Sequence, residues 1–356
     1  MGSLLQPAKL LDARQAHQRG RLTPDELRAA EDEAVLGAVG LQEELGLDVI
    51  SDGEMRRASW ADTRNHLEGL EPRPAPRSYP ASVREMDRAG STPLTVTGKV
   101  RSKAGHQLGW EYPFLKAHAR ARTKYTMAAP SYHRRFWSDA VSPESGYASC
   151  EAYLADVRDW LHEAAAWLAG QGCTYIQLDA PHYPLLIDPE TRAFYERQGW
   201  TAERYIARGI ELDNHVMAGH PEVTFGFHLC RGNQASRWLV SGGYEPIARA
   251  VFRNVAAQRL LLEYDDERSG SFQPLDEVPD DKMVVLGLVT TKSPRRETVE
   301  ELEGRVREAA RHVDLERLAV SPQCGFATSV LGNALSHDDQ RAKLETLART
   351  AERVWG

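Results

Sequence analysis

Cysteine is scarce in this sequence, with four residues among 356. So few cysteines exclude the dense disulfide framework of a small secreted protein and are typical of a reducing cytoplasm, where cysteine is a core residue, a metal ligand or a nucleophile. An excess of positive charge is also lacking, because 44 basic and 51 acidic residues give a net charge of −7. We therefore expect no binding to nucleic acid or to an anionic membrane surface.

Long hydrophobic runs and nucleotide-binding signatures are missing as well. No apolar stretch approaches the roughly 20 residues of a membrane-spanning helix, and residues 1–20 lack the basic and then apolar pattern of a secretory signal. These absences predict a cytoplasmic protein without a membrane segment. The sequence also contains no G-x-G-x-x-G after a strand, no Walker pattern and no G-x-S-x-G elbow.

Short apolar runs alternate with amphipathic stretches along most of the chain. The predicted strands are 47–51, 125–129, 174–179, 222–230, 259–265, 283–289 and 318–321. The predicted helices are 27–45, 148–169, 202–218, 245–257, 297–312 and 337–354. Repeated strand–helix units predict a parallel sheet in an α/β protein. Six or seven units in succession favour a closed (β/α)₈ TIM barrel forming one domain over residues 1–356, with an open doubly wound sheet as the alternative.

Two parts of the chain depart from this alternation. The segment around 70–110 contains the Pro- and Arg-rich stretch EPRPAPRSYP and then the alternating stretch PLTVTGKV, which predict a surface excursion and a β-hairpin. The first barrel strand is not evident, because Gly2 and Ser3 follow the initial methionine directly. By contrast, the start of the first predicted helix is well marked by Thr23, Pro24 and Glu26, which predict a capping box.

Polar side chains occur where most of the predicted strands end. In a barrel these carboxyl ends share one face, where catalytic groups gather. We therefore expect the following residues to point into one opening: Glu54, Asp179, His228, Cys230, Glu263, Lys292 and Cys324.

Four of these residues have side chains of the kind that bind metals: His228, Cys230, Glu263 and Cys324. Two thiolates, an imidazole and a carboxylate suit tetrahedral Zn²⁺. His228 and Cys230 are two positions apart on one strand, so their side chains face the same side. An H-x-C pair alone is a weak signal, because cysteine is often simply buried. The carboxylate and the second thiol at two other strand ends strengthen the prediction of a zinc site.

Several nearby residues have a structural interpretation beside the functional one. Glu54 could be an acid at a helix start, and Asp179 could cap a turn. The run 265–268 (DDER) is interpreted as a solvated loop with internal ion pairs rather than a second cation site. The run 231–233 (RGN) could bind an anion or merely turn the chain. Cys150 and Cys173 are interpreted as core residues.

An ordered set of motifs resembles the cobalamin-independent methionine synthase family, in particular the catalytic C-terminal half of its long members. The motifs are LDVISDGE, LTVTGKV, YIQLDAP, HLC, LLLEYDDERSG, VVLGLVTTKSP and SPQCG. The resemblance implies that His228, Cys230, Glu263 and Cys324 bind zinc. It also implies that Ser3, Glu54 and Asp179 bind homocysteine or a similar small thiol, and that a methyl or other alkyl group moves onto this zinc-activated thiol in methionine biosynthesis.

The chain departs from the family pattern at three places. The family's Asp-Glu-Pro is Asp179-Ala180-Pro181 here, its usual continuation after H-x-C is replaced by residues 231–233, and its D-x-H-S-P histidine is matched by Lys292. Lys292 is therefore predicted to assist the leaving group or to neutralise an anion.

These departures leave two alternative functions open. One is an epoxyalkane–coenzyme M type thiol transferase. The other is a non-catalytic methyl-binding barrel or one that serves a corrinoid partner. The expected partners are a thiol acceptor and an alkyl donor, both small molecules, with a corrinoid protein or a second copy of the chain as macromolecular partners.

Overall fold

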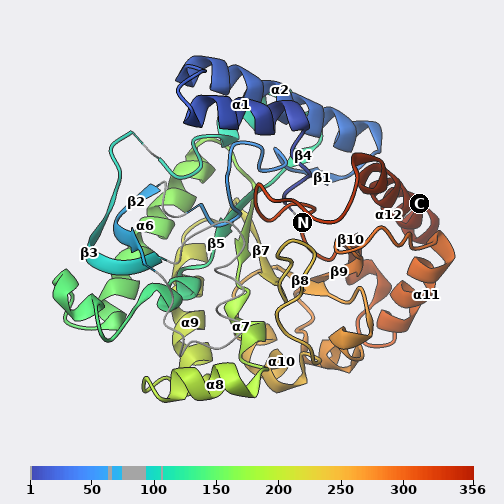
Figure 1. Ribbon diagram of the computed structural model, residues 1–356. Helices are drawn as coiled ribbons and strands as arrows, with labels where there is room; N and C mark the ends of the chain where they lie inside the picture. The colour runs from blue at the N-terminus through green and yellow to red at the C-terminus, as the bar shows by residue number, and fades with distance from the viewer. Residues whose placement is uncertain (1, 63–65, 74–93, 106) are drawn as a thin grey trace.

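The computed structural model describes residues 2–62, 66–73, 94–105 and 107–356. A six-stranded sheet with the order β10-β9-β8-β7-β6-β5 forms its centre, and all of its neighbouring strands are parallel. Its strands are β5 (Tyr125–Ala128), β6 (Tyr175–Asp179), β7 (Thr224–Leu229), β8 (Arg259–Glu263), β9 (Met283–Val289) and β10 (Leu318–Pro322). Figure 1 shows this sheet in the middle of the molecule with helices around it.

A short parallel pair continues the sheet beyond β5. The strand β1 (Val49–Ile50) pairs with β4 (Arg122–Thr123). Only Lys124 separates β4 from β5, and its backbone N–H donates to the carbonyl of Ile50 at 2.9 Å. The two strand segments β4 and β5 therefore act as one strand position that joins β1 to the main sheet.

Residues 2–5 close the ring between β1 and β10. The N–H of Leu4 donates to the carbonyl of Gly53 at 3.0 Å, and the N–H of Phe326 donates to the carbonyl of Ser3 at 2.8 Å. The segment thus bonds on one side to the chain after β1 and on the other to the chain after β10. It fills the place of the first strand, which the sequence did not reveal, and it favours the barrel over the open sheet.

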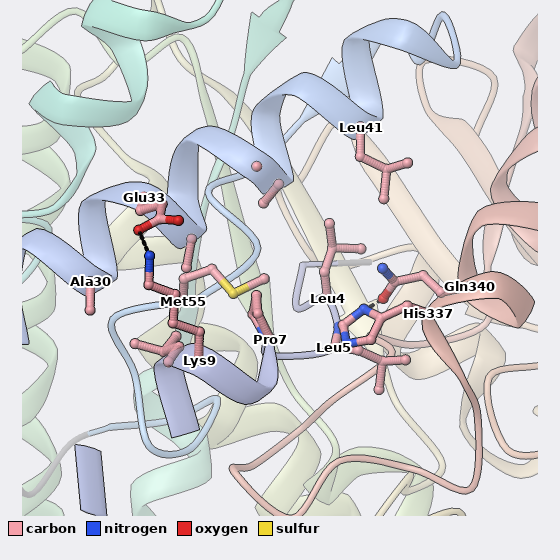
Figure 2. Close-up of a pocket in the computed structure, with 14 residues that line it drawn as sticks. Leu4, Leu5, Pro7, Lys9, Ala30, Glu33, Leu41, Met55, His337 and Gln340 are labelled. Carbon is pink, nitrogen blue, oxygen red and sulfur yellow. Dashed lines mark hydrogen bonds and ion pairs between the residues drawn. The ribbon is translucent and has the colours of Figure 1, made fainter. Parts of the chain in front are cut away.

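The closing segment is held from outside by helices. The N–H of Leu5 donates to Oε1 of Gln340 at 2.7 Å. Figure 2 shows Leu4 below Leu41 and Leu5 beside His337 and Gln340. These residues line a hollow of about 400 Å³ between the first two helices and the last one. These contacts fix the segment, and Ser3 with it, against the barrel.

The outer layer consists of helices that connect successive strands and of the last helix, which follows β10. They are α1 (Ala8–Gln18), α2 (Pro24–Glu44), α5 (Tyr112–His118), α6 (Cys150–Gly170), α7 (His182–Leu185), α8 (Pro189–Glu196), α9 (Ala202–Met217), α10 (Glu245–Phe252), α11 (Val299–Ala309) and α12 (His337–Trp355). The predicted capping box at the start of α2 is present. None of the helices in the described ranges is long and apolar enough to cross a membrane.

The predicted helix 245–257 is too long, because α10 ends at Phe252. The residues that follow are held by other partners. The ammonium of Lys282 donates to the carbonyls of Val255 and Ala257 at 2.7 and 2.8 Å, and the N–H of Ala256 donates to Asn214 at 2.7 Å. These side-chain contacts replace the helical hydrogen bonds and bring the chain into β8.

The excursion begins and ends as an antiparallel pair. The strands β2 (Leu67–Pro72) and β3 (Leu94–Ser102) pair with each other, so the predicted hairpin strand has a partner that runs into the start of the Pro-rich stretch. Residues 74–93, which include most of that stretch, lie outside the described residues. The assignment of residues 1–356 to one domain stays a prediction.

Candidate active site

The structure brings together the four residues that the sequence suggested as metal ligands. His228 lies near the end of β7, Cys230 follows it, Glu263 ends β8, and Cys324 follows β10. One ligand atom from each side chain lies within 4.8 Å of those of the other three. The sulfur atoms of Cys230 and Cys324 are 3.6 Å apart, and both cysteines are free thiols. The curvature of the barrel therefore brings groups from three strand ends to one point.

The polar atoms that face this point lack hydrogen-bond partners. Nε2 of His228 and both carboxylate oxygens of Glu263 are buried without a hydrogen bond, and their nearest charged neighbours lie 3.8 Å away. Buried polar atoms almost always form hydrogen bonds in folded proteins, so three atoms beside two thiols that form none need an explanation. A set of two sulfur atoms, one imidazole nitrogen and one carboxylate matches the ligand preference of Zn²⁺.

The charges of the group favour a cation in its centre. Burial lowers the pKa of His228, but its contacts with the carboxylates of Asp179 and Glu263 outweigh burial and raise that pKa to about 10. The hydrogen bond between the thiols lowers the pKa of Cys324 and raises that of Cys230, so the pair favours one shared negative charge. Carboxylates and thiols, which carry or share negative charge, thus surround a single histidine.

Asp179 contacts His228, one of the proposed ligands, on the side of the ring away from the other three. The two residues are register partners in the β6–β7 ladder, and Oδ1 of Asp179 accepts a hydrogen bond from Nδ1 of His228 at 2.9 Å. A carboxylate on one ring nitrogen holds the imidazole orientation and leaves Nε2 for a metal. The same Oδ1 accepts from Nε2 of Gln177 at 2.7 Å.

Glu54 enters the pocket from a strained turn after β1. Its φ is 56°, a left-handed conformation that is uncommon for a residue with a side chain. Asp52 stabilises the turn, because its Oδ1 accepts from the N–H of Glu54 at 2.9 Å. Burial raises the pKa of Glu54 to about 7, although Arg57 opposes the shift, and Thr126 donates to Glu54 Oε1 at 2.8 Å.

Two glycines allow the closing segment to approach this pocket. A Cβ atom on Gly325 would lie 2.0 Å from Oγ of Ser3, and one on Gly2 would lie 2.4 Å from Oε1 of Glu54. Ser3, Glu54, Asp179, His228, Cys230 and Cys324 all line one pocket. The structure therefore places the three predicted substrate-binding residues beside the predicted metal ligands.

Lys292 lies elsewhere, in a buried charge cluster behind Glu263. Its Nζ is 2.5 Å from Oδ2 of Asp265, and Arg268 is 3.3 Å from Asp265 and 3.8 Å from Glu263. Lys292 is not among the described residues that line the pocket. The interpretation of 265–268 as a solvated loop is wrong for Asp265, whose side chain is fully buried because two cations neutralise it. The internal pair of Arg268 with Asp266, at 2.9 Å, is present.

Sequence reasoning missed several residues of the pocket wall. Trp60, Gln177, Asn233 and Leu239 also line it. Asn233 donates to the carbonyl of Gly325 at 2.8 Å, which ties the loop after β7 to the loop after β10. Its place next to the HLC motif could have suggested it, whereas no sequence signal indicated Trp60.

Residues 231–233 divide between the pocket and the barrel wall, because Gly232 and Asn233 line the pocket whereas Arg231 does not. The Arg231 guanidinium is fully buried and lies 3.9 Å from the centre of the Tyr244 ring, so it packs against the barrel and turns the chain. Cys150 and Cys173 are buried core residues, as predicted.

Comparison with known proteins identifies the family. The family model described as the catalytic domain of cobalamin-independent synthase matches residues 147–337. The uncharacterized protein YxjH of Bacillus subtilis is 36% identical over 361 residues, which cover 100% of this chain and 93% of YxjH. The chain belongs to the cobalamin-independent methionine synthase family.

Two further relatives bear on the family's fold and activity. A methionine synthase of Thermococcus kodakarensis is 24% identical over 92% of this chain and 85% of its own length. The structure of a Listeria monocytogenes protein assigned as a vitamin-B12-independent methionine synthase superimposes with a TM-score of 0.74 at 26% identity, covering 100% of this chain and 96% of that one. The fold is therefore the α/β barrel of this family, and the chain is a methionine-synthase-like methyltransferase by membership.

Proposed function

We propose that this protein is a zinc-dependent S-alkyltransferase that moves a methyl group onto homocysteine or a similar small amino-acid thiol. His228, Cys230, Glu263 and Cys324 would hold the zinc ion. The observation that carries the proposal is the convergence of their ligand atoms within 4.8 Å, with Nε2 of His228 and both Glu263 oxygens buried and without a hydrogen bond. Bound Zn²⁺ lowers the pKa of a thiol that reaches it, so that the sulfur is nucleophilic at neutral pH.

The other residues of the pocket orient the acceptor. Glu54 and Asp179 are the acids that receive an α-ammonium group. Oδ1 of Asp179 is occupied by Gln177 and His228, so Oδ2 is the atom left for the substrate. Backbone N–H groups near Ser3 would bind the α-carboxylate. Lys292 stabilises Asp265 behind Glu263 and acts on the reaction only indirectly.

The pocket favours an amino-acid thiol over coenzyme M. A sulfonate needs a cation, but no Lys or Arg is among the residues described as lining the pocket, whereas Glu54 and Asp179 are. This charge pattern suits a ligand that carries an ammonium group close to its thiol. Transfer joins the acceptor sulfur to the methyl carbon while the bond from that carbon to the donor breaks, and the leaving group takes the bonding electron pair.

A thiol-acceptor screen by mass spectrometry tests the proposal. Homocysteine, cysteine, glutathione and coenzyme M are each offered methylfolates, methylcobalamin and simple epoxides with zinc-loaded protein. We expect methylated homocysteine, and the productive donor separates a folate enzyme from one that needs a corrinoid partner. Full turnover by protein shown to be metal-free, or binding without product from any pair, would overturn the proposal. Product only with coenzyme M and an epoxide would establish the alternative transferase.

A further inference from the structure

A chain of hydrogen bonds runs from the candidate metal centre down the inside of the barrel. Nδ1 of His228 donates to Oδ1 of Asp179 at 2.9 Å, and Nε2 of Gln177 donates to the same oxygen at 2.7 Å. Below them, Nζ of Lys124 donates to Oε1 of Gln177 at 2.8 Å. All four side chains are buried, so each bond lies in a low-dielectric interior, where the direction of a hydrogen bond matters most.

The strands place these residues one below the other. Gln177 and Asp179 are two positions apart on β6, so both point into the barrel. Lys124 lies between β4 and β5, and its ammonium is 5.9 Å from the centre of the Tyr175 ring, which is two positions further down β6. Lys124 therefore lies in the interior layer beneath the pocket, where its ammonium donates to Gln177 and interacts electrostatically with Asp179 and Glu54.

We propose that Lys124 is a positioning residue that fixes the direction of this chain and so keeps Nε2 of His228 as the metal-binding nitrogen. The inference rests on the proposed zinc centre. An ammonium group has only donors, so Gln177 must turn its oxygen toward Lys124 and its NH₂ toward Asp179. Asp179 then accepts from both neighbours, and the one proton that His228 would keep when its Nε2 binds zinc is held on Nδ1.

Removal of the ammonium would remove this constraint. The buried oxygen of the Gln177 amide would then lose its donor, so the amide would turn toward the pocket to find another one, withdraw its NH₂ group from Asp179 and loosen the contact of Asp179 with His228. A lysine that only filled space would not have this effect, because an apolar side chain of equal length would fill the same volume. Burial lowers the pKa of Lys124 to about 8, so most of the population is still ammonium at pH 7.

The test measures zinc affinity by chelator competition, the absorption bands of the Co²⁺-substituted protein, and thermal unfolding. Lys124→Met should weaken zinc binding about tenfold or more, the range for lost partners of metal-bound histidines, and shift the Co²⁺ bands. Lys124→Arg, which is also a pure donor, should restore both. Lys124→Gln keeps a polar partner for Gln177 but no longer fixes the orientation of the Gln177 amide. This variant therefore tests the role of Lys124 if Lys124→Met does not fold.

Lys282→Met is the matched control. Lys282 is another buried lysine, and it donates to the carbonyls of Val255 and Ala257 at the other end of β8. Its loss should lower the melting temperature without changing zinc affinity. Wild-type zinc affinity and an unchanged Co²⁺ spectrum in a folded Lys124→Met or Lys124→Gln variant would overturn the role of Lys124 while leaving the zinc centre intact. Wild-type protein that binds no zinc would overturn the proposed function itself.

Discussion

Nζ of Lys292 lies 2.5 Å from Oδ2 of Asp265, and both side chains are buried behind Glu263. The family has a histidine at the position of Lys292, so a role in proton transfer to the leaving group was the first expectation. The ion pair directs the ammonium away from the pocket and toward a carboxylate that would otherwise be costly to bury. Lys292 therefore maintains the charge balance around Glu263, together with Arg268.

A double-mutant cycle on Lys292 and Asp265 distinguishes stabilisation of the buried Asp265 carboxylate from proton transfer to the leaving group. Lys292→Met should lower the free energy of unfolding by up to about 3 kcal/mol, because Asp265 keeps only Arg268 as a partner. The double variant Lys292→Met/Asp265→Asn should recover most of that loss in urea denaturation and retain turnover in proportion to its zinc content. A stable, zinc-loaded double variant with kcat reduced about 100-fold would instead assign proton transfer to Lys292.

Loss of one thiol should remove the metal. Cys324→Ser is expected to lower the bound zinc measured by elemental analysis and to abolish methyl transfer, since a neutral hydroxyl replaces a thiolate ligand. Zinc at 1,000 times its dissociation constant should stabilise the folded wild type by about 4 kcal/mol, which is seen as a higher melting temperature. The variant should show no such rise. Cys150→Ala, at a buried position away from the pocket, is the control that keeps full zinc content.

The ionisation of Glu54 should link stability to pH. Its pKa is about 7 in the folded protein, compared with the ordinary value of 4.5. Between these values the folded state holds a proton that the unfolded state has released, so stability should fall as the pH rises from 4.5 to 7. Glu54→Gln should be more stable than the wild type above pH 7 by roughly 1–3 kcal/mol, measured by urea unfolding at pH 5 and pH 8.

The same variant should bind the acceptor poorly. An ionised Glu54 attracts the α-ammonium group and a neutral amide does not, so Glu54→Gln should raise the KM for homocysteine. The wild-type KM should fall as the pH rises through 7. A variant that loses stability at pH 8 while its KM stays unchanged would show that Glu54 is a structural acid of its turn.

The strands and their barrel arrangement could be predicted from the sequence, and the closure of the ring by residues 2–5 could not. The strand β9 was predicted to the residue, since the run MVVLGLV is buried almost throughout. The closing segment has no such pattern, because its ring-closing bonds reach Gly53 and Phe326, which are far away in the sequence. A pattern within residues 2–5 cannot encode partners at such distances.

The same contrast holds for the candidate site. The proposed ligands could be found because all of them stand at or just after strand ends, and barrel geometry brings such ends together. The contacts of Lys124 with Gln177 and of Lys292 with Asp265 depend on which interior layer each side chain reaches. Each bond links residues on different strands, and no spacing along the chain indicates such a pair.

The close approach of Gly325 to Ser3 offers a test of the closing segment. A Cβ atom on Gly325 would lie 2.0 Å from Oγ of Ser3 and 3.1 Å from its backbone nitrogen, so Gly325→Ala should push the segment out of the pocket. We expect a raised KM for the acceptor and reduced stability, with zinc content unchanged because Cys324 keeps its place in the chain. Ser3→Gly in the same background removes the clashing hydroxyl and should recover part of the loss in steady-state kinetics. If Gly325→Ala alone leaves KM and stability at wild-type values, residues 2–5 do not form a wall of this pocket in solution.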